Sequence, residues 1–163
     1  INKLKNQNFD NNGSIAASGK IDLSLINSLL DQEFYNTKNQ RSYDIKDFDI
    51  NFVKGLPFED GLANLNFFTA KFISNNIKKI STEDFVIILC GGVRKNKTLI
   101  LNLKKLLKNT FYDIDVFKIN GDFIESQAFA YLSIRSYLKK IISYPSTTNV
   151  LKPSIGGEIK KNY

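Results

Sequence analysis

The sequence contains no methionine, tryptophan or histidine, and only one cysteine, Cys90, among its 163 residues. Without histidine there is no Cys-His nucleophile pair and no Cys/His metal site, and one cysteine makes no internal disulfide. A lone cysteine after an apolar run is most often a small buried hydrophobe, and we expect this of Cys90. Because the first residue is Ile1 rather than methionine, we expect a piece of a longer protein.

Long apolar stretches are also missing. The longest uninterrupted runs are short pieces such as residues 85–90, whereas a membrane span needs about 20 apolar residues. No charged start leads into an apolar signal core. We therefore expect a soluble cytoplasmic protein without a membrane partner. With 42% hydrophobic and 24% charged residues the composition is that of an ordinary globular domain, which excludes wholesale disorder and collagen.

Acidic residues are fewer than basic ones, 16 against 23, and the net charge of +7 suggests a nucleic-acid partner. Against this, the lysines are spread along the chain, and arginine, which contacts bases and phosphates bidentately, occurs only at Arg41, Arg94 and Arg135. We expect a solvated basic surface and no nucleic-acid binding. A basic nucleic-acid binder remains an alternative that rests on net charge alone.

The apolar spacing predicts an α/β fold. Helical periodicity predicts helices over 22–32, 57–80, 96–108 and 123–140. Residues 33–57 are predicted to be a polar connector with short helical pieces, which is either functional or packed across another part of the protein. Two β-rich runs predict parallel strands at 85–90 and 115–119, each ended by a glycine turn, and the first is apolar throughout, as in a strand covered on both faces. Ligands of such sheets bind beyond the carboxyl ends of the strands.

The first glycine turn contains Gly91 and Gly92 between the first strand and a helix that begins near Asn96. Glycines allow the backbone to approach a flat ligand or a phosphate, and the helix start presents free N–H groups. The pattern is neither a Walker loop nor a full G-x-G-x-x-G motif. A ligand-binding turn and a plain tight turn therefore both remain open.

The second glycine turn contains Gly121, Asp122 and, three residues later, Glu125. Asp122 is a good helix N-cap, and Glu125 stands where a capping box would place its acidic residue. In the alternative interpretation, Glu125 points from a helix start into a cleft and orients a hydroxyl-rich ligand. Both interpretations can hold, because the cap requires only one of the two carboxylates.

Five segments resemble the anhydro-N-acetylmuramic acid kinase family, in that family's order. Residues 121–135 (GDFIESQAFAYLSIR) resemble its G-D-x-x-E-A-x-A-F-A-[YW]-L-A-x-R segment. Residues 12–20, 59–70 and 90–96 resemble its N/D-G-x-x-A-A-x-G-K, D-x-x-A-T-L-T-x-x-T-A and C-G-G-G-x-x-N segments, and 144–157 resembles its P-x-x-T-G ending. The resemblance covers nearly the whole chain and is specific to this family rather than to kinases in general.

The chain departs from the family pattern at several points. Val93 stands in place of a third glycine, so we expect a less close approach to the nucleotide there, and Ile45 stands where relatives often carry arginine. Asn149 replaces a glycine, but asparagine tolerates a left-handed backbone. The family's amino-terminal half, with its first phosphate-binding loop and the D-T-G-P-G-N segment that holds the catalytic aspartate, would lie before Ile1.

The resemblance implies part of the carboxyl-terminal lobe of a sugar-kinase/actin-like (RNase H-type) fold. It also implies ATP and Mg²⁺ as cofactors and anhydro-N-acetylmuramic acid as substrate, whose 1,6-anhydro ring is opened with water while O6 is phosphorylated, in cell-wall recycling. By this match Gly91, Gly92 and Asn96 lie at the adenosine side and Glu125 near the sugar. The catalytic base is expected upstream, with no catalytic or metal-binding residue in this chain.

The expected partner is the missing amino-terminal lobe, and a second copy of the chain is a further candidate. Alone, the chain is expected to be inactive, since it holds half of the nucleotide site and no base. The competing interpretation is a non-catalytic α/β module that binds a nucleotide or a partner protein. Its main support is the absence of histidine and of any nucleophile pair.

Overall fold

Helix α4 (Phe58–Ile80) begins directly after Pro57 and is the centre of the first of two structural units. Proline suits a helix start, and the acidic residues of the first turn and lysines of the last turn suit the helix dipole. The computed structural model describes residues 8–36, 43–80 and 85–160. The units are Ile1–Asp113 and Ile114–Tyr163, and each is described by itself.

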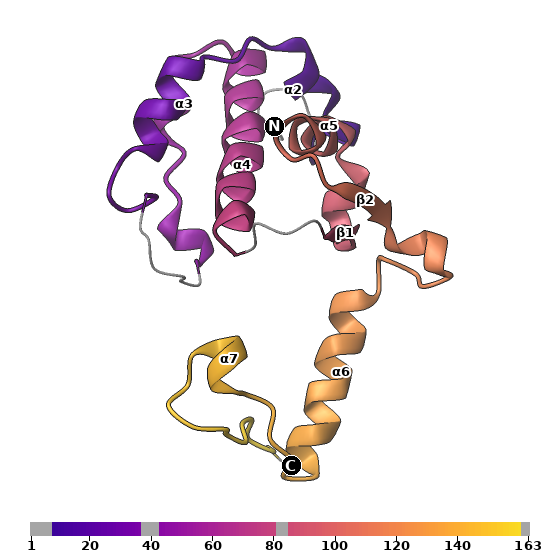
Figure 1. Cartoon of the computed structure of the whole chain (residues 1–163). Helices are drawn as coiled ribbons and strands as arrows, with labels where there is room; N and C mark the ends of the chain where they lie inside the picture. The colour runs from indigo at the N-terminus through magenta and orange to yellow at the C-terminus, as the bar shows by residue number, and fades with distance from the viewer. Residues whose placement is uncertain (1–7, 37–42, 81–84, 161–163) are drawn as a thin grey trace. The chain divides into compact units, whose positions relative to one another are not determined.

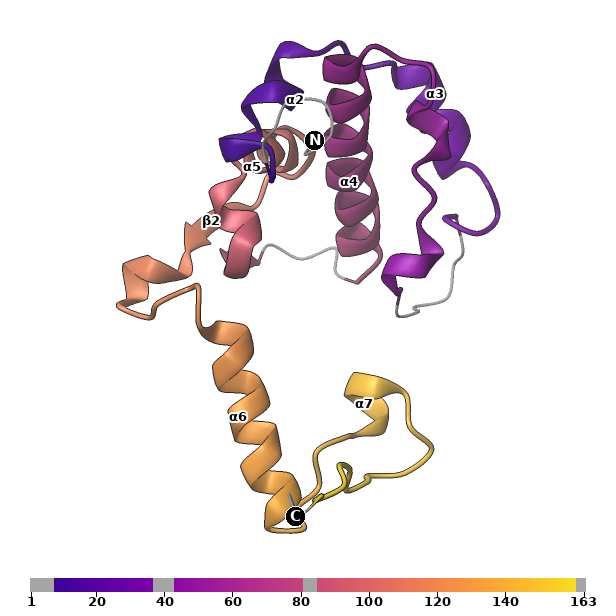
Figure 2. The same cartoon turned by 180° about the vertical axis from the view of Figure 1, so that it is seen from behind.

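Two apolar clusters cover opposite sides of α4, which lies between α3 (Leu23–Leu30) and α5 (Lys97–Leu106) in both views (Figures 1 and 2). On the α5 side, Ala70 packs with Leu99, Ile100, Leu103 and Leu107. On the α3 side, aromatic residues of the connector pack against Phe68 and Phe72 of α4, with Ile26 and Leu30 of α3. The helices predicted over 22–32, 57–80 and 96–108 are confirmed.

The connector contains two short 3-10 helices, Ile45–Asp47 and Asn51–Val53, as predicted. Its aromatic rings pack edge to face against α4. The centroids of the Tyr35 and Phe68 rings are 5.5 Å apart, and those of the Phe48 and Phe72 rings are 5.3 Å apart. Edge-to-face pairs of this kind add to the area that the rings bury. Of the two interpretations of the connector, the structure bears out packing across another part of the protein, while residues 37–42 lie outside the described part.

The chain before α3 is pressed against the start of α4. Asp10 caps α2 (Ser14–Ser18) by accepting hydrogen bonds from the backbone N–H groups of Ile15 and Ala16, both at 2.9 Å. Gly19 lies so close to α4 that a Cβ there would overlap the carbonyl group of Glu59. Asn64 of α4 is 1% exposed and joins the two segments, since its Oδ1 accepts from the Asp22 N–H at 2.8 Å.

Among the described residues the sheet has two strands, β1 (Val86–Leu89) and β2 (Thr110–Asp113), which pair in parallel from Val86–Thr110 to Leu89–Asp113. Helix α5 makes the crossover between them. The Asn109 side chain donates to the Phe85 carbonyl at 3.0 Å and aligns the two strand starts. The α/β class, the parallel pairing and the first strand are confirmed.

Three expectations for this region are wrong. The second strand was predicted over 115–119, but it lies at Thr110–Asp113 and is followed by a 3-10 helix, Ile114–Phe117. The described residues cover strand β1 on one face only, because Ile87 and Leu89 pack inward while Val86 and Ile88 are 52% and 51% exposed. Cys90 is exposed rather than buried, because side chains of β1 alternate between the two faces and Cys90 continues the exposed face of Val86 and Ile88.

The second unit contains α6 (Ile124–Tyr137) and α7 (Pro145–Thr148). The helix predicted over 123–140 is confirmed, and its apolar residues Phe129 and Leu138 are 62% and 53% exposed. Arg135 closes the end of α6 by donating from Nε and Nη2 to the Ile141 carbonyl, at 3.0 and 2.7 Å. Asn149 adopts the predicted left-handed conformation, with φ 56°. Within the described ranges, every helix is too short or too polar to span a membrane.

Candidate nucleotide-side turn and sugar-side helix

Gly91 and Gly92 begin a 3-10 helix, Gly91–Lys95, at the carboxyl end of β1. Gly91 has φ +66°, in the left-handed region that glycine tolerates, whereas Gly92 is not in this region. Apart from the adjoining residues and the backbone of the same helix, a Cβ built on either residue would meet no described atom within 4 Å. Packing within the described chain therefore does not require a glycine at position 92, and the space beside both residues is open.

Asn96 follows the turn and caps helix α5, its Oδ1 accepting from the Leu99 N–H at 3.0 Å. The same oxygen accepts from the Asn66 side chain at 3.3 Å, and Asn102 donates to the Asn66 Oδ1 at 3.0 Å. Gly13 packs against this group, because a Cβ at Gly13 would overlap the Asn96 Oδ1. The Asn96 oxygen thus serves the fold, and the Nδ2 group is the part of this side chain suited to donate to a ligand.

A pocket of about 200 Å³ lies beside Asn96, between α2, α4 and the start of α5. Its polar lining comes from Asp10, Asn66, Thr69 and Asn96. Neither Gly91 nor Gly92 lines it. Asn96 therefore lies between the glycine turn and an open pocket of the first unit with a mixed polar and apolar lining.

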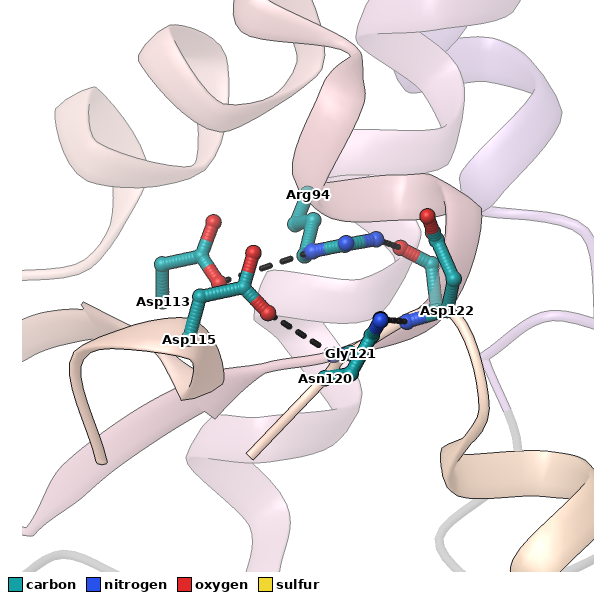
Figure 3. Close-up of polar contacts among 7 residues, drawn as sticks. Arg94, Asp113, Asp115, Asn120, Gly121 and Asp122 are labelled. Atoms are coloured by element: carbon teal, nitrogen blue, oxygen red, sulfur yellow. Dashed lines mark hydrogen bonds and ion pairs between the residues drawn. The ribbon is translucent and has the colours of Figure 1, made fainter. Parts of the chain in front are cut away.

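Arg94 and Asp113 hold the turn, and the sequence predictions did not include them. The Arg94 Nη1 donates to the Gly91 carbonyl at 2.8 Å, and Nε lies 3.5 Å from the Asp113 Oδ1 (Figure 3). The Arg94 side chain is 6% exposed. Two signals were present in the sequence, a scarce arginine two residues after a pair of glycines and an aspartate after a β-rich run. Their pairing depends on β2 ending at Asp113. The prediction placed the second strand over 115–119, so it did not put Asp113 at a strand end.

The second turn differs from its prediction. Asp122 is not the N-cap of α6; Phe123 holds that position without a side-chain cap bond, so the predicted capping box is wrong. Instead, the Gly121 N–H donates to the Asp115 Oδ1 at 2.7 Å and the Asp122 N–H donates to the Asn120 Oδ1 at 3.0 Å (Figure 3). These side-chain acceptors keep Asp122 outside the helix and move the helix start one residue onward.

Glu125 is exposed and lies in the first turn of α6, where a negative charge suits the helix dipole. The 3-10 helix Ile114–Phe117 separates its turn from β2, so Glu125 does not directly follow a strand end as predicted. Gly91, Gly92 and Asn96 lie together in the first unit, and Glu125 belongs to the second. Because Asp122 does not cap the helix, the carboxylate of Glu125 has no capping-box role in this structure.

Comparison with known proteins identifies the family. A sequence profile described as anhydro-N-acetylmuramic acid kinase matches residues 1–162. The chain belongs to the anhydro-N-acetylmuramic acid kinase family. An anhydro-N-acetylmuramic acid kinase of Pelagibacter ubique is 52% identical over 163 residues, covering 95% of this chain and 43% of the relative. Relatives of the same name from Zymomonas mobilis and Rhizorhabdus wittichii are 36% and 34% identical and cover 93% and 91% of this chain.

The chain spans about two fifths of the length of these curated kinases, with coverage of 43%, 41% and 41%. The resemblance drawn from the five sequence segments is confirmed at the level of the family. The roles of Gly91, Gly92, Asn96 and Glu125 within the anhydro-N-acetylmuramic acid kinase family stay predictions for this chain.

Proposed function

We propose that this chain is the carboxyl-terminal lobe of a two-lobed, sugar-kinase/actin-type anhydro-N-acetylmuramic acid kinase. The complete enzyme uses ATP to phosphorylate O6 of anhydro-N-acetylmuramic acid while water opens the 1,6-anhydro ring. The product is N-acetylmuramic acid 6-phosphate. The observation that carries this proposal is a family match over residues 1–162 that includes an open Gly91–Gly92 turn at a strand end.

The turn is suited to the adenosine side of ATP. It lies at the carboxyl end of a parallel strand, where ligands of α/β sheets bind. At Gly92, neither the backbone conformation nor packing requires a glycine. The missing side chain is therefore consistent with space left for a bound ligand. Asn96 adds an amide N–H donor one 3-10 helix further on. These three residues form the nucleotide side of the proposed site.

Glu125 is the proposed sugar-side residue. Its exposed carboxylate can accept hydrogen bonds from sugar hydroxyls or orient the water that opens the anhydro ring. The base that activates the acceptor is expected in the part of the protein that precedes this chain. ATP supplies the phosphoryl group, and Mg²⁺ on its phosphates neutralises the charge that develops during transfer. Within residues 8–36, 43–80 and 85–160, no three His, Cys, Asp or Glu side chains form a metal-binding group.

A chimera tests the proposal. This chain replaces the matching segment of the Pelagibacter ubique kinase, which aligns with it over 163 residues. We expect ATP-dependent formation of a 6-phosphorylated sugar by the chimera and none by the chain alone. Gly92→Val, which puts a branched side chain into the open space, should raise the Michaelis constant for ATP at least tenfold and leave that for the sugar within twofold.

Glu125→Gln is the matched change on the sugar side. It keeps the size of the side chain and should lower turnover at least tenfold at an unchanged melting temperature. A chimera that folds but transfers no phosphate would contradict the kinase proposal. Binding of nucleotide without transfer would then favour the non-catalytic module, and strongly salt-dependent binding of DNA or RNA would favour the basic nucleic-acid binder.

A further inference from the structure

The Arg94 guanidinium is a buried charge beside an open turn. Its side chain is 6% exposed, although it lies only two residues after Gly92. A cation is costly to bury unless anionic or dipolar partners compensate the lost hydration. The partners of Arg94 therefore show what this position contributes.

Two of those partners lie at the ends of neighbouring strands. Nη1 donates to the Gly91 carbonyl at 2.8 Å, and Gly91 comes two residues after Leu89, the last residue of β1. Nε lies 3.5 Å from Oδ1 of Asp113, the last residue of β2 and the register partner of Leu89. The guanidinium thus links the turn after one strand to the end of the next strand (Figure 3).

The turn needs such a link because its glycines contribute no side-chain contacts of their own. Glycine loses more conformational freedom on ordering than any other residue, and Gly91 also adopts a left-handed φ of +66°. Around both glycines no described atom lies within 4 Å of a Cβ position. A hydrogen bond from a buried, charge-paired guanidinium to the Gly91 carbonyl restrains the turn from its inner side and leaves the outer side accessible.

We propose that Arg94, paired with Asp113, is a positioning residue that holds the Gly91–Gly92 turn in the conformation that receives the adenosine side of ATP. This inference rests on the proposed function. Arg94 acts through the turn rather than by touching the nucleotide, since its side chain is buried and already directed to Gly91 and Asp113. When only a fraction of the turn is in the competent conformation, the apparent dissociation constant rises by the reciprocal of that fraction.

Arg94→Lys in the chimera is the decisive variant. Lysine keeps the positive charge for Asp113 but lacks the planar fork that serves two acceptors at once. We expect the Michaelis constant for ATP to rise about tenfold, with turnover at saturating ATP and the Michaelis constant for the sugar within twofold. Asp113→Asn should shift the ATP constant in the same direction, because it removes the compensating charge of the buried guanidinium.

Arg135→Lys is the matched control. Arg135 also uses its guanidinium on a backbone carbonyl, that of Ile141, but it does so in the second unit. This variant should lower the melting temperature without changing the Michaelis constant for ATP. The comparison separates the loss of an arginine-to-carbonyl link in general from the loss of the link at the turn.

Hydrogen exchange in the 163-residue chain provides a readout without activity. The amides hydrogen-bonded within the 3-10 helix Gly91–Lys95 should exchange about tenfold faster in Arg94→Lys, while those of α4 stay unchanged. Unaltered exchange and an unaltered ATP constant, in a chimera whose parent is active, would overturn the inference and leave the kinase proposal intact. Equal rises in both Michaelis constants would also overturn it, as a general structural effect. A parent chimera that neither binds nor uses ATP overturns the kinase proposal, and the inference with it.

Discussion

Two pairs of glycines in the first unit occupy opposite environments. Gly13 and Gly19 are enclosed: a Cβ at the first would overlap the Asn96 side chain, and at the second the Glu59 backbone. Gly91 and Gly92 face open space, with no described atom within 4 Å of either Cβ position. The first pair lets segments of the chain approach one another, whereas the second leaves room that the described chain does not fill. The same residue type therefore marks packing in one place and a candidate ligand surface in the other.

Gly19→Ala should have the largest effect on stability. The added methyl group would overlap a helix backbone, which cannot move aside as a flexible side chain can. We expect the free energy of unfolding to fall by about 3 kcal/mol, in the upper range for overpacked sites. Urea denaturation of the 163-residue chain, followed by circular dichroism, measures the change.

Gly61→Ala provides the control for this prediction. Gly61 lies inside α4, and a Cβ there would make ordinary contact with the Val53 Cβ at 3.7 Å. Alanine should therefore stabilise the helix, by about 0.5–1 kcal/mol. If Gly19→Ala proved as harmless as Gly61→Ala, the enclosed environment of Gly19 would be refuted.

Asn96 contacts the enclosed Gly13 and also follows the open Gly91–Gly92 turn. Two substitutions separate its structural role from its proposed role in ATP binding. Asn96→Ala removes the cap of α5 and the acceptor of the Asn66 amide, which should cost about 2 kcal/mol. Asn96→Asp keeps both acceptor functions and should cost less than about 0.5 kcal/mol, since aspartate caps as well as asparagine. In the chimera, Asn96→Asp should still weaken ATP binding, because it removes the amide donor and adds a negative charge. Equal ATP constants for Asn96→Asp and the parent would restrict Asn96 to its structural role.

Gly91→Ala tests the energetic cost of the left-handed backbone conformation separately from any effect of side-chain packing. An L-residue in the left-handed region costs about 1 kcal/mol, and no described atom opposes the methyl group. Thermal unfolding should show this modest loss. Gly91→Asn should recover part of it, because asparagine tolerates the left-handed region, as Asn149 does in this structure. A loss as large as that of Gly19→Ala would mean that Gly91 is packed rather than open.

Gly92→Ala should have the smallest effect on stability, less than about 0.5 kcal/mol, because position 92 requires neither a left-handed backbone nor a missing side chain. The main effect of Gly92→Ala should be on the Michaelis constant for ATP. Parallel measurement of the melting temperature and of the ATP constant in the chimera gives the comparison. A variant that is destabilised but binds ATP normally would place Gly92 with the packing glycines.

Much of this arrangement could be predicted from the sequence, because apolar spacing defines the faces that pack. The periodicity of residues 57–80 and 96–108 was sufficient to place α4 and α5, and the order strand, helix, strand was sufficient to predict parallel pairing, although the second strand was placed too late in the chain. The open turn was also found, because Gly-Gly between a strand and a helix is a local signal.

What could not be predicted depends on contacts between distant residues. The second strand was placed over 115–119 by its β-branched and aromatic residues, whereas the Asn109 link to Phe85 and the length of α5 fix the pairing earlier. The prediction that Asp122 caps α6 was wrong because the Asn120 and Asp115 side chains accept hydrogen bonds from the backbone N–H groups of this turn. The Arg94–Asp113 pair exists only in this register, so the local signals at the two residues do not show that they pair.

The exposure of Cys90 gives the chain a chemical reporter at the position where it is most useful. Cys90 is the only cysteine in the sequence, and it immediately precedes Gly91. Thiol reactivity depends on access to the sulfur, so one maleimide or iodoacetamide would attach at a single known place. A nucleotide bound at the turn should slow this alkylation in proportion to occupancy, without any substitution. The same exposed thiol allows two chains to join by a disulfide in air, so the reductant in the buffer controls the apparent size of the purified chain.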